Sequence, residues 1–197
     1  MIILGFETTD TVASVAIYIN GEISSMSLNR ELRHAESVLP AAESLLTMKG
    51  LSVADVDAFA VDIGPGSFTG VRIGVCLANA LAYANQKPVI PVNALETLAY
   101  AKDSDNKYVA AIIDAKNGNG YAALYKENHA VIEPYACAIS EFMQKIPSDC
   151  ILTGTACEKN VYPSAESIVM LASERTGYDQ VSPLYLKPSQ AERVLKV

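Results

Sequence analysis

The residues with the clearest potential for chemistry lie in DIGPGSFTGVRIG, residues 62–74, which holds four glycines in thirteen positions. Glycine-rich turns that lead into a helix bind phosphate in several protein classes, because their backbone amides approach an anion closely. The spacing excludes two such motifs. A Walker A loop would need Gly-Lys where the sequence has Val71 and Arg72, and a dinucleotide fingerprint would need glycine at the position of Thr69.

Ser67 in this stretch is not placed like a hydrolase nucleophile. A nucleophile elbow has glycines two residues before and after its serine, whereas Pro65 and Thr69 stand there. The pattern instead predicts a strand, a tight turn with Gly64 and Gly66 at positive φ, and a helix capped by a nearby hydroxyl. The first amides of that helix would either hold an anion or be satisfied by the cap, and the sequence leaves both open.

The helix after the turn carries a stripe of small residues. Gly70, Gly74, Ala78 and Ala82 follow one another every four positions, so they share one helix face. Each glycine inside a helix costs about 1 kcal/mol relative to alanine, which indicates that another backbone comes close to this face. The sequence does not decide which backbone this is. It could belong to the protein's own sheet or first helix, or to a second subunit.

Two similar segments predict how these residues are positioned. The chain opens with an apolar strand that ends at Glu7, a polar turn and a second strand, and the same order returns at 108–125 with Asp114 at the end of its first strand. A pattern repeated at half the chain length predicts two copies of one hairpin-led α/β module. The polar DSDNK at 103–107 predicts the division, with an N-terminal lobe at 1–102 and a smaller C-terminal lobe at 103–197.

The periodicity of apolar residues predicts the remaining elements. Helices are expected at 33–48, 69–86, 95–102, 138–146 and 163–176, and strands at 22–29, 56–64, 88–94 and 150–156.

Composition narrows the function classes. The 197 residues carry a net charge of -7, which is the wrong sign for a protein that grips nucleic-acid phosphates by itself. The apolar stretch 73–86 is shorter than the roughly 20 residues that span a membrane. The four cysteines include no C-x-x-C pair and no nearby histidine at zinc-ligand spacing, so we expect reduced and mostly buried thiols, with a disulfide as the alternative. We therefore expect a cytoplasmic protein with no membrane anchor.

Six segments occur in the order and spacing of the bacterial TsaB (YeaZ) family, which this chain resembles from end to end. They are ILGFETTDTVASVAIY, RHAESVLP, DIGPGSFTGVRIG, ALETLA, DAKNGNGY and SPLYLK, and the glycine stretch is the most specific of them. The DAK segment departs from the family, which commonly has an acid where this chain has Asn119. That departure weakens any ligand role carried over to this segment.

The resemblance implies a two-lobed α/β fold of the actin, hexokinase and Hsp70 class (ASKHA, ribonuclease H-like), with a mixed sheet and flanking helices in each lobe. It also implies a part in making the threonylcarbamoyladenosine of tRNA, as partner of the catalytic paralogue TsaD and of the ATPase TsaE. In the family the first-lobe helices form the subunit interface. The residues expected at that interface are Val38, Leu39, Ala42, Leu46, Gly70, Arg72, Ile73, Gly74, Leu77, Ala78 and Leu81.

The paralogue also indicates whether this chain is itself the enzyme. TsaD has two metal-binding histidines spaced as H-x-x-x-H, and the corresponding residues here are Ala94 and Leu98. Neither side chain can ligate a metal. The resemblance therefore predicts a non-catalytic subunit with no catalytic residue, no metal and no cofactor of its own, with ATP or ADP held, if at all, at the interface of the complex.

Two other functions stay open from the sequence. The fold class often closes two lobes around ATP, so an independent nucleotide-binding ATPase or kinase would place phosphate and metal at Glu7, Thr8, Thr9 and the adjoining Asp10, with Asp114 opposite. Alternatively, Glu7 and Asp114 only hydrogen-bond local backbone. A homodimer formed through the same helices would compete with the heterodimer. tRNA is expected to be contacted only through the complex.

Overall fold

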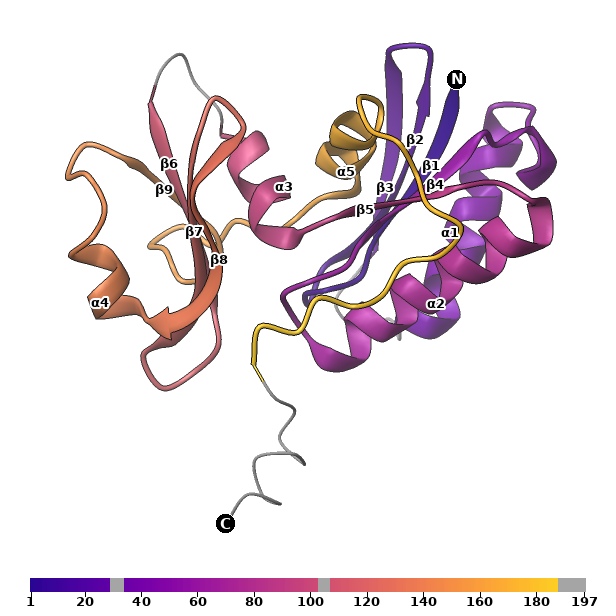
Figure 1. The fold of residues 1–197 in the computed structure, drawn as a ribbon. Coiled ribbons are helices and arrows are strands. Elements are labelled where there is room, and N and C mark those ends of the chain that lie inside the picture. The colour runs from indigo at the N-terminus through magenta and orange to yellow at the C-terminus, as the bar shows by residue number, and fades with distance from the viewer. Residues whose placement is uncertain (29–33, 103–106, 188–197) are drawn as a thin grey trace.

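The chain forms two lobes, each built on its own sheet (Figure 1). The computed structural model describes residues 1–28, 34–102 and 107–187. The first sheet has the strand order β3-β2-β1-β4-β5 and the second β8-β7-β6-β9. The strands are β1 (Ile2–Glu7), β2 (Ala13–Ile19), β3 (Glu22–Leu28), β4 (Ala58–Asp62), β5 (Val89–Val92), β6 (Tyr108–Asp114), β7 (Asn119–Lys126), β8 (His129–Ala138) and β9 (Ile151–Thr153). The α-helices are α1 (His34–Met48), α2 (Phe68–Asn85), α3 (Ala94–Tyr100), α4 (Ile139–Met143) and α5 (Ala165–Ala172).

The two sheets begin in the same way. β1 pairs antiparallel with β2 and parallel with β4, and β6 pairs antiparallel with β7 and parallel with β9. Glu7 and Asp114 end the first strand of their sheets, as the repeated pattern predicted. The two-lobed α/β fold predicted from the sequence is therefore confirmed.

Alternate residues of the first sheet point to opposite faces, and both faces are covered. Leu4, Phe6 and Ile17 pack with α1 and α2 in one core. Ile3 and Ala16 pack on the other side with Ile168 and Val169 of α5. Because both faces are buried, the strands read as continuous apolar runs.

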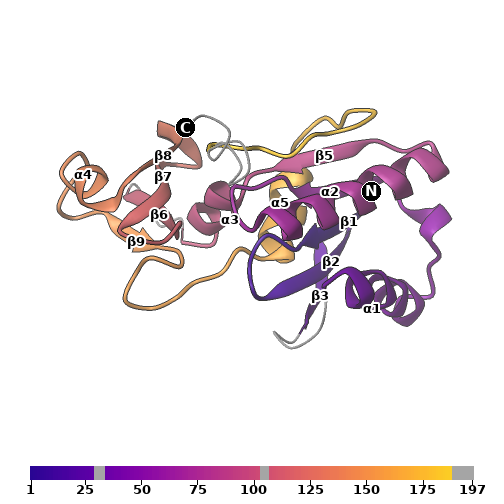
Figure 2. The same ribbon diagram turned by 90° about the horizontal axis from the view of Figure 1, so that it is seen from below.

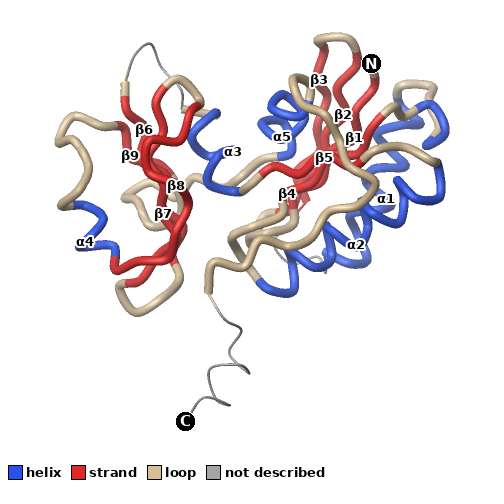
Figure 3. Tube along the Cα trace, viewed as in Figure 1, coloured by secondary structure: helices blue, strands red, loops and turns tan. Residues whose placement is uncertain are grey.

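The second sheet is also covered on both faces. Leu95 and Leu98 of α3 pack on one face, and Phe142 of α4 packs on the other. Figures 1 and 3 show α3 and α5 lying between the two sheets, with α1 and α2 outside the first sheet and α4 outside the second. The view from below gives the same order of layers (Figure 2).

The chain passes from the first lobe to the second and then returns. The predicted boundary segment includes 103–106, which lies outside the described residues. After β9 the chain comes back, and α5 packs against β1, β2 and β4 of the first sheet. The lobe built on the first sheet therefore includes residues far beyond 102. The predicted division at 103 concerns only the point where the chain first passes from the first lobe to the second, and it stays a prediction.

Residues 178–187, which we call the C-terminal strap, run along the first lobe without forming a helix or a sheet strand (Figure 1). Tyr178 exchanges two backbone hydrogen bonds of 2.8 Å with Val89 of β5, and the side chain of Asn79 bonds both the N–H and the C=O of Val181 at 2.9 Å. The strap thus covers the edge of β5 and one side of α2.

An aromatic cluster fixes the end of the strap. The ring of Tyr185 stacks on Phe68 with centroids 4.4 Å apart, and its hydroxyl accepts a hydrogen bond of 2.9 Å from Nε of Arg72. Aromatic pairs contribute about 1 kcal/mol beyond the area they bury. We therefore expect Tyr185→Ala to lower the free energy of unfolding in urea by about 1 kcal/mol. Tyr83→Ala serves as the control, since that ring is 87% exposed, and an equal loss in both variants would mean that the stack contributes nothing.

None of the helices in the described ranges has both the length and the apolar character needed to cross a lipid bilayer.

Candidate functional site

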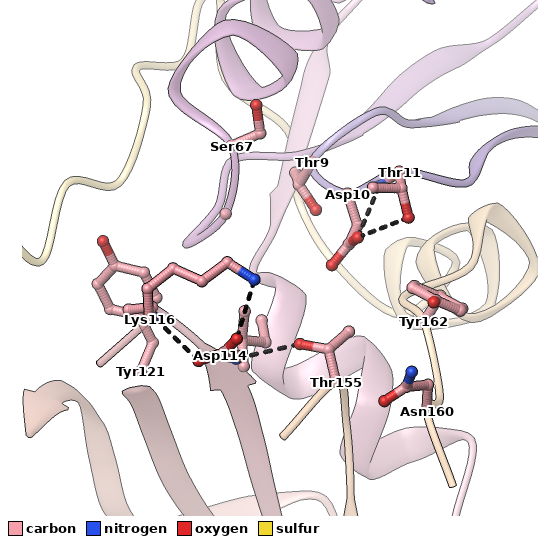
Figure 4. Close-up of a pocket in the computed structure, with 13 residues that line it drawn as sticks. Thr9, Asp10, Thr11, Ser67, Asp114, Lys116, Tyr121, Thr155, Asn160 and Tyr162 are labelled. Atoms are coloured by element: carbon pink, nitrogen blue, oxygen red, sulfur yellow. Dashed lines mark hydrogen bonds and ion pairs between the residues drawn. The ribbon is translucent and has the colours of Figure 1, made fainter. Parts of the chain in front are cut away.

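A cleft of about 670 Å³ lies where the two lobes meet (Figure 4). Three turns form most of its wall: the β1–β2 turn, the glycine turn before α2 and the β6–β7 turn. The lining residues are Thr9, Asp10, Thr11, Gly66, Ser67, Ile113, Asp114, Ala115, Lys116, Tyr121, Thr155, Asn160 and Tyr162. The duplicated hairpins therefore bring corresponding turns of the two lobes to one cleft.

The glycine turn packs directly on the β1–β2 turn. The amide of Ser67 donates a hydrogen bond of 2.7 Å to the carbonyl of Thr9. A Cβ on Gly66 would lie 2.5 Å from the same carbonyl oxygen. Gly64 has a positive φ of 101°, as predicted, but Gly66 does not, so Gly66 is required by this close contact and not by its φ.

The cap of α2 uses another of its first amides. The hydroxyl of Ser67 accepts a hydrogen bond of 3.3 Å from the amide of Gly70. With the Ser67 amide bonded to Thr9, two groups that would face an anion at this helix start have partners within the chain. For these two amides, satisfaction by the protein itself is the role that the structure shows.

Two of the four predicted nucleotide-binding residues do not line the cleft. Glu7 and Thr8 are fully buried, and the hydroxyl of Thr8 donates to the carbonyl of Gly70 at 2.7 Å. Thr9 and Asp114 do line the cleft. Glu7 therefore affects the cleft only indirectly, because it holds the β1–β2 turn through its hydrogen bonds to Thr9.

Beneath the turns, Glu7 lies beside a second acid, Asp62, which the sequence reasoning did not select. Both side chains are fully buried. Burial raises the pKa of Glu7. Burial, together with the neighbouring Glu7 carboxyl, raises the pKa of Asp62 well above its usual range. The signal was present in the sequence, since Asp62 ends a strand directly before the glycine turn.

Asp114 forms its contacts within its own turn. Its Oδ1 accepts the amide of Lys116 at 2.8 Å, and its Oδ2 lies 3.1 Å from the Lys116 ammonium (Figure 4). The amide and then the ammonium of Lys116 lower the pKa of the Asp114 carboxyl. The amide of Asp114 is held in turn by the hydroxyl of Thr155 at 3.0 Å. Asp114 thus makes the local backbone contacts that were predicted as the alternative to ligand binding.

The described lining of the cleft has little charge complementarity to a polyphosphate. Of the charged residues that line it, Asp10 and Asp114 are acids, and the ammonium of Lys116 is already paired with Asp114. The Ser67 amide is also engaged. Within the described ranges, no group of three or more His, Cys, Asp or Glu side chains is arranged to hold a metal ion.

The small-residue stripe of α2 faces the protein's own first sheet. Gly70, Gly74, Ala78 and Ala82 are buried. A Cβ on Gly70 would lie 2.0 Å from the carbonyl oxygen of Thr8, and one on Gly74 would lie 2.4 Å from the Thr8 hydroxyl. The backbone that approaches the stripe is thus that of the β1–β2 turn, and the stripe is not available to a second subunit.

The predicted interface residues divide into two groups. The first group is buried within the chain, and it consists of Val38, Ala42, Leu46, Gly70, Gly74 and Ala78. The others reach the surface, and they are Leu39, Arg72, Ile73, Leu77 and Leu81. Whether a partner contacts this second group stays a prediction.

A groove of about 460 Å³ runs between α1 and α2 on the outer side of the first lobe. Its lining is mostly apolar and consists of Leu4, Leu39, Ala42, Glu43, Leu46, Thr47, Leu51, Ser52, Val53 and Leu81. Leu39 is 47% exposed, and Met48 at the end of α1 is 75% exposed. Met48 does not line the groove, but Leu39 does, and an apolar groove with an exposed leucine is typical of a protein interface.

Comparison with known proteins places this fold in a family. The family model for TsaD, tRNA N6-adenosine threonylcarbamoyltransferase, matches residues 29–172. The tRNA threonylcarbamoyladenosine biosynthesis protein TsaB of Escherichia coli K12 is 29% identical over 99% of this chain and 98% of its own length. The chain belongs to the TsaB (YeaZ) family. TsaB of Bacillus subtilis is 32% identical over 68% of this chain, and that match covers only 58% of the relative.

A solved structure of a TsaB (YeaZ) family member has the same architecture. YeaZ from Pseudomonas aeruginosa superposes with a TM-score of 0.78 at 26% identity, over 94% of this chain and 99% of that one. The agreement covers both lobes, so the cleft and the α1–α2 groove lie on a fold that the family shares.

Proposed function

We propose that this chain is a non-catalytic partner subunit that binds a TsaD-like threonylcarbamoyltransferase and, with a TsaE-like ATPase, supports formation of N6-threonylcarbamoyladenosine in tRNA. Relatives matched along the chain are named for the biosynthesis of this nucleoside. The observation that carries the proposal is the apolar α1–α2 groove with Leu39 at its rim. An independent ATPase or kinase is not favoured, because the one basic side chain among the described residues that line the cleft, Lys116, is paired with Asp114.

The absence of a metal pair at α3 supports the non-catalytic role. Ala94 and Leu98 stand where the catalytic paralogue is expected to have its histidines, and both are fully buried in the core between α3 and the second sheet. A metal ligand at either position would need a cavity where the side chains now pack. These two positions therefore contribute to folding.

The proposal assigns the other components to the complex. It gives this chain no cofactor of its own and leaves ATP or ADP to the interface between subunits. The net charge of -7 supports contact with tRNA through the partner, which would supply the positive surface. A homodimer through the same groove would compete with the partner, and the complex would work in the cytoplasm.

The test is to measure pairing with the host's TsaD-like protein by size-exclusion chromatography with light scattering, and its dissociation constant by calorimetry. Leu39→Asp places a charge at the rim of the groove. We expect the variant to weaken pairing about 30-fold or more, since a lost apolar anchor costs about 2 kcal/mol. Folding should be unchanged, because Leu39 is 47% exposed.

The matched control is Val131→Asp, which places the same charge on a similarly exposed residue of β8 in the other lobe. It should pair like the unmodified chain. If Leu39→Asp pairs normally as well, the groove is not the interface. If the unmodified chain ignores the TsaD-like protein altogether, the partner role itself is wrong.

A further inference from the structure

The buried acids Glu7 and Asp62 end two neighbouring parallel strands, β1 and β4. Each uses one oxygen to hold the turn that follows it. Oε1 of Glu7 accepts the amide of Thr9 at 2.5 Å and the Thr9 hydroxyl at 2.7 Å. Oδ1 of Asp62 accepts the amide of Gly64 at 2.7 Å. The two turns held in this way are the β1–β2 turn and the glycine turn, which both line the cleft.

The second oxygen of each acid has no hydrogen-bond donor among the described residues. These atoms are Oε2 of Glu7 and Oδ2 of Asp62, and both are buried. A buried carboxylate oxygen without a donor is costly, and two buried carboxylates side by side add mutual repulsion. A proton on one of the acids removes both costs, because its O–H donates to the other carboxylate.

The charged groups around the pair do not offer another solution. Asp10 acts on Glu7 and Glu96 acts on Asp62, and both are acids that disfavour further negative charge. Glu96 is itself paired with Arg175. Within the described part of the chain, no basic side chain forms an ion pair with Glu7 or Asp62.

We propose that Glu7 and Asp62 hold one proton between them at neutral pH, and that this shared proton fixes the two turns that face the cleft. Glu7 accepts two hydrogen bonds from Thr9, whereas Asp62 accepts one from Gly64, and such bonds favour the ionised form of a carboxyl group. The proton therefore resides on Asp62 and is donated to Glu7. Its loss at alkaline pH leaves two adjacent buried carboxylates, which repel each other and release the turns. The proposal is independent of the partner role, since it concerns the isolated chain.

The pH dependence follows from the direction of the shift. Because the pKa of Asp62 is raised in the folded chain, the folded state binds more protons than the unfolded state above the ordinary carboxyl pKa of about 4. The stabilisation is complete below that value. It is lost progressively as the pH rises toward the folded-state pKa.

Asp62→Asn tests the proposal in the full chain. The new amide keeps an acceptor for Gly64 and offers a permanent N–H to Glu7, so it imitates the protonated acid. Urea unfolding is measured from pH 5 to pH 9 for both proteins. We expect the unfolding equilibrium constant of the unmodified chain to rise by about tenfold per pH unit relative to the variant, which is the slope for one bound proton. Asp149→Asn, at an exposed acid, should run parallel to the unmodified chain.

A second measurement does not depend on a variant that folds. Carbon-13 NMR of the labelled Asp62 carboxyl in the unmodified chain should report a protonated acid at pH 7. Amide exchange of Thr9 and Gly64, corrected for its intrinsic pH dependence, should accelerate when that carboxyl ionises. A carboxyl that is ionised at pH 7 would overturn the proposal. So would stabilisation of the unmodified chain by Mg²⁺ at pH 8 that Asp62→Asn abolishes, because a metal ion would then replace the proton.

Discussion

Gly70→Ala is expected to lower the free energy of unfolding by about 3 kcal/mol, the upper part of the usual range for overpacking. The added Cβ would lie 2.0 Å from the carbonyl oxygen of Thr8. That oxygen belongs to the backbone, and the Thr8 hydroxyl donates in turn to the carbonyl of Gly70. The turn and the helix must therefore separate, which a flexible side chain would not require.

Chemical unfolding followed by circular dichroism gives the free energy of unfolding for this variant. Thr69→Ala is the control, because it changes the exposed neighbouring residue of the same helix turn. It should differ from the unmodified chain by no more than about 0.5 kcal/mol. A Gly70→Ala protein as stable as this control would show that α2 does not contact the β1–β2 turn as closely as described.

The second large effect concerns α5, which returns to the first lobe from beyond the second. Ile168→Ala is expected to cost about 3 kcal/mol, because the side chain is fully buried against the first sheet and its removal leaves a cavity. Met170→Ala on the same helix is the control, since that side chain is only partly buried.

The location of the loss matters as much as its size. Amide exchange measured on Ile168→Ala should show faster opening of β1 and β4, which α5 contacts. The strands β6 and β7 belong to the other sheet and should be less affected. A loss confined to the second lobe would mean that α5 does not complete the first.

Each helix and strand predicted from the sequence has a counterpart in the structure, with bounds that differ by a few residues, and one strand was not predicted. α2 spans Phe68–Asn85, almost as its apolar periodicity indicated, and both leading hairpins are present. The ten-residue β8 was not predicted. Its turn places Glu127 and Asn128 at positive φ, which is not a common hairpin sequence, and Pro134 lies within the strand.

At the candidate site, the sequence could not predict which side chains face the cleft. The sequence placed Glu7, Thr8 and Thr9 together at a turn, and only Thr9 reaches the cleft. Which side of a strand end each residue faces depends on the pleat and on what packs there, here Gly70 against Thr8. The pairing of Glu7 with Asp62 arises from the adjacency of β1 and β4, which no local pattern specifies.

The return of the chain to its first lobe also sets the order in which the molecule can be made. During synthesis the strands of the first sheet leave the ribosome early, but α5, which covers one face of that sheet including Ile3 and Ala16, follows much later. The edge of β5 is joined later still, by Tyr178. At ordinary translation rates an apolar sheet face stays open on the order of ten seconds. A nascent chain of this kind is a natural client for chaperones, and a product that stops before α5 is expected to aggregate instead of forming a smaller working subunit.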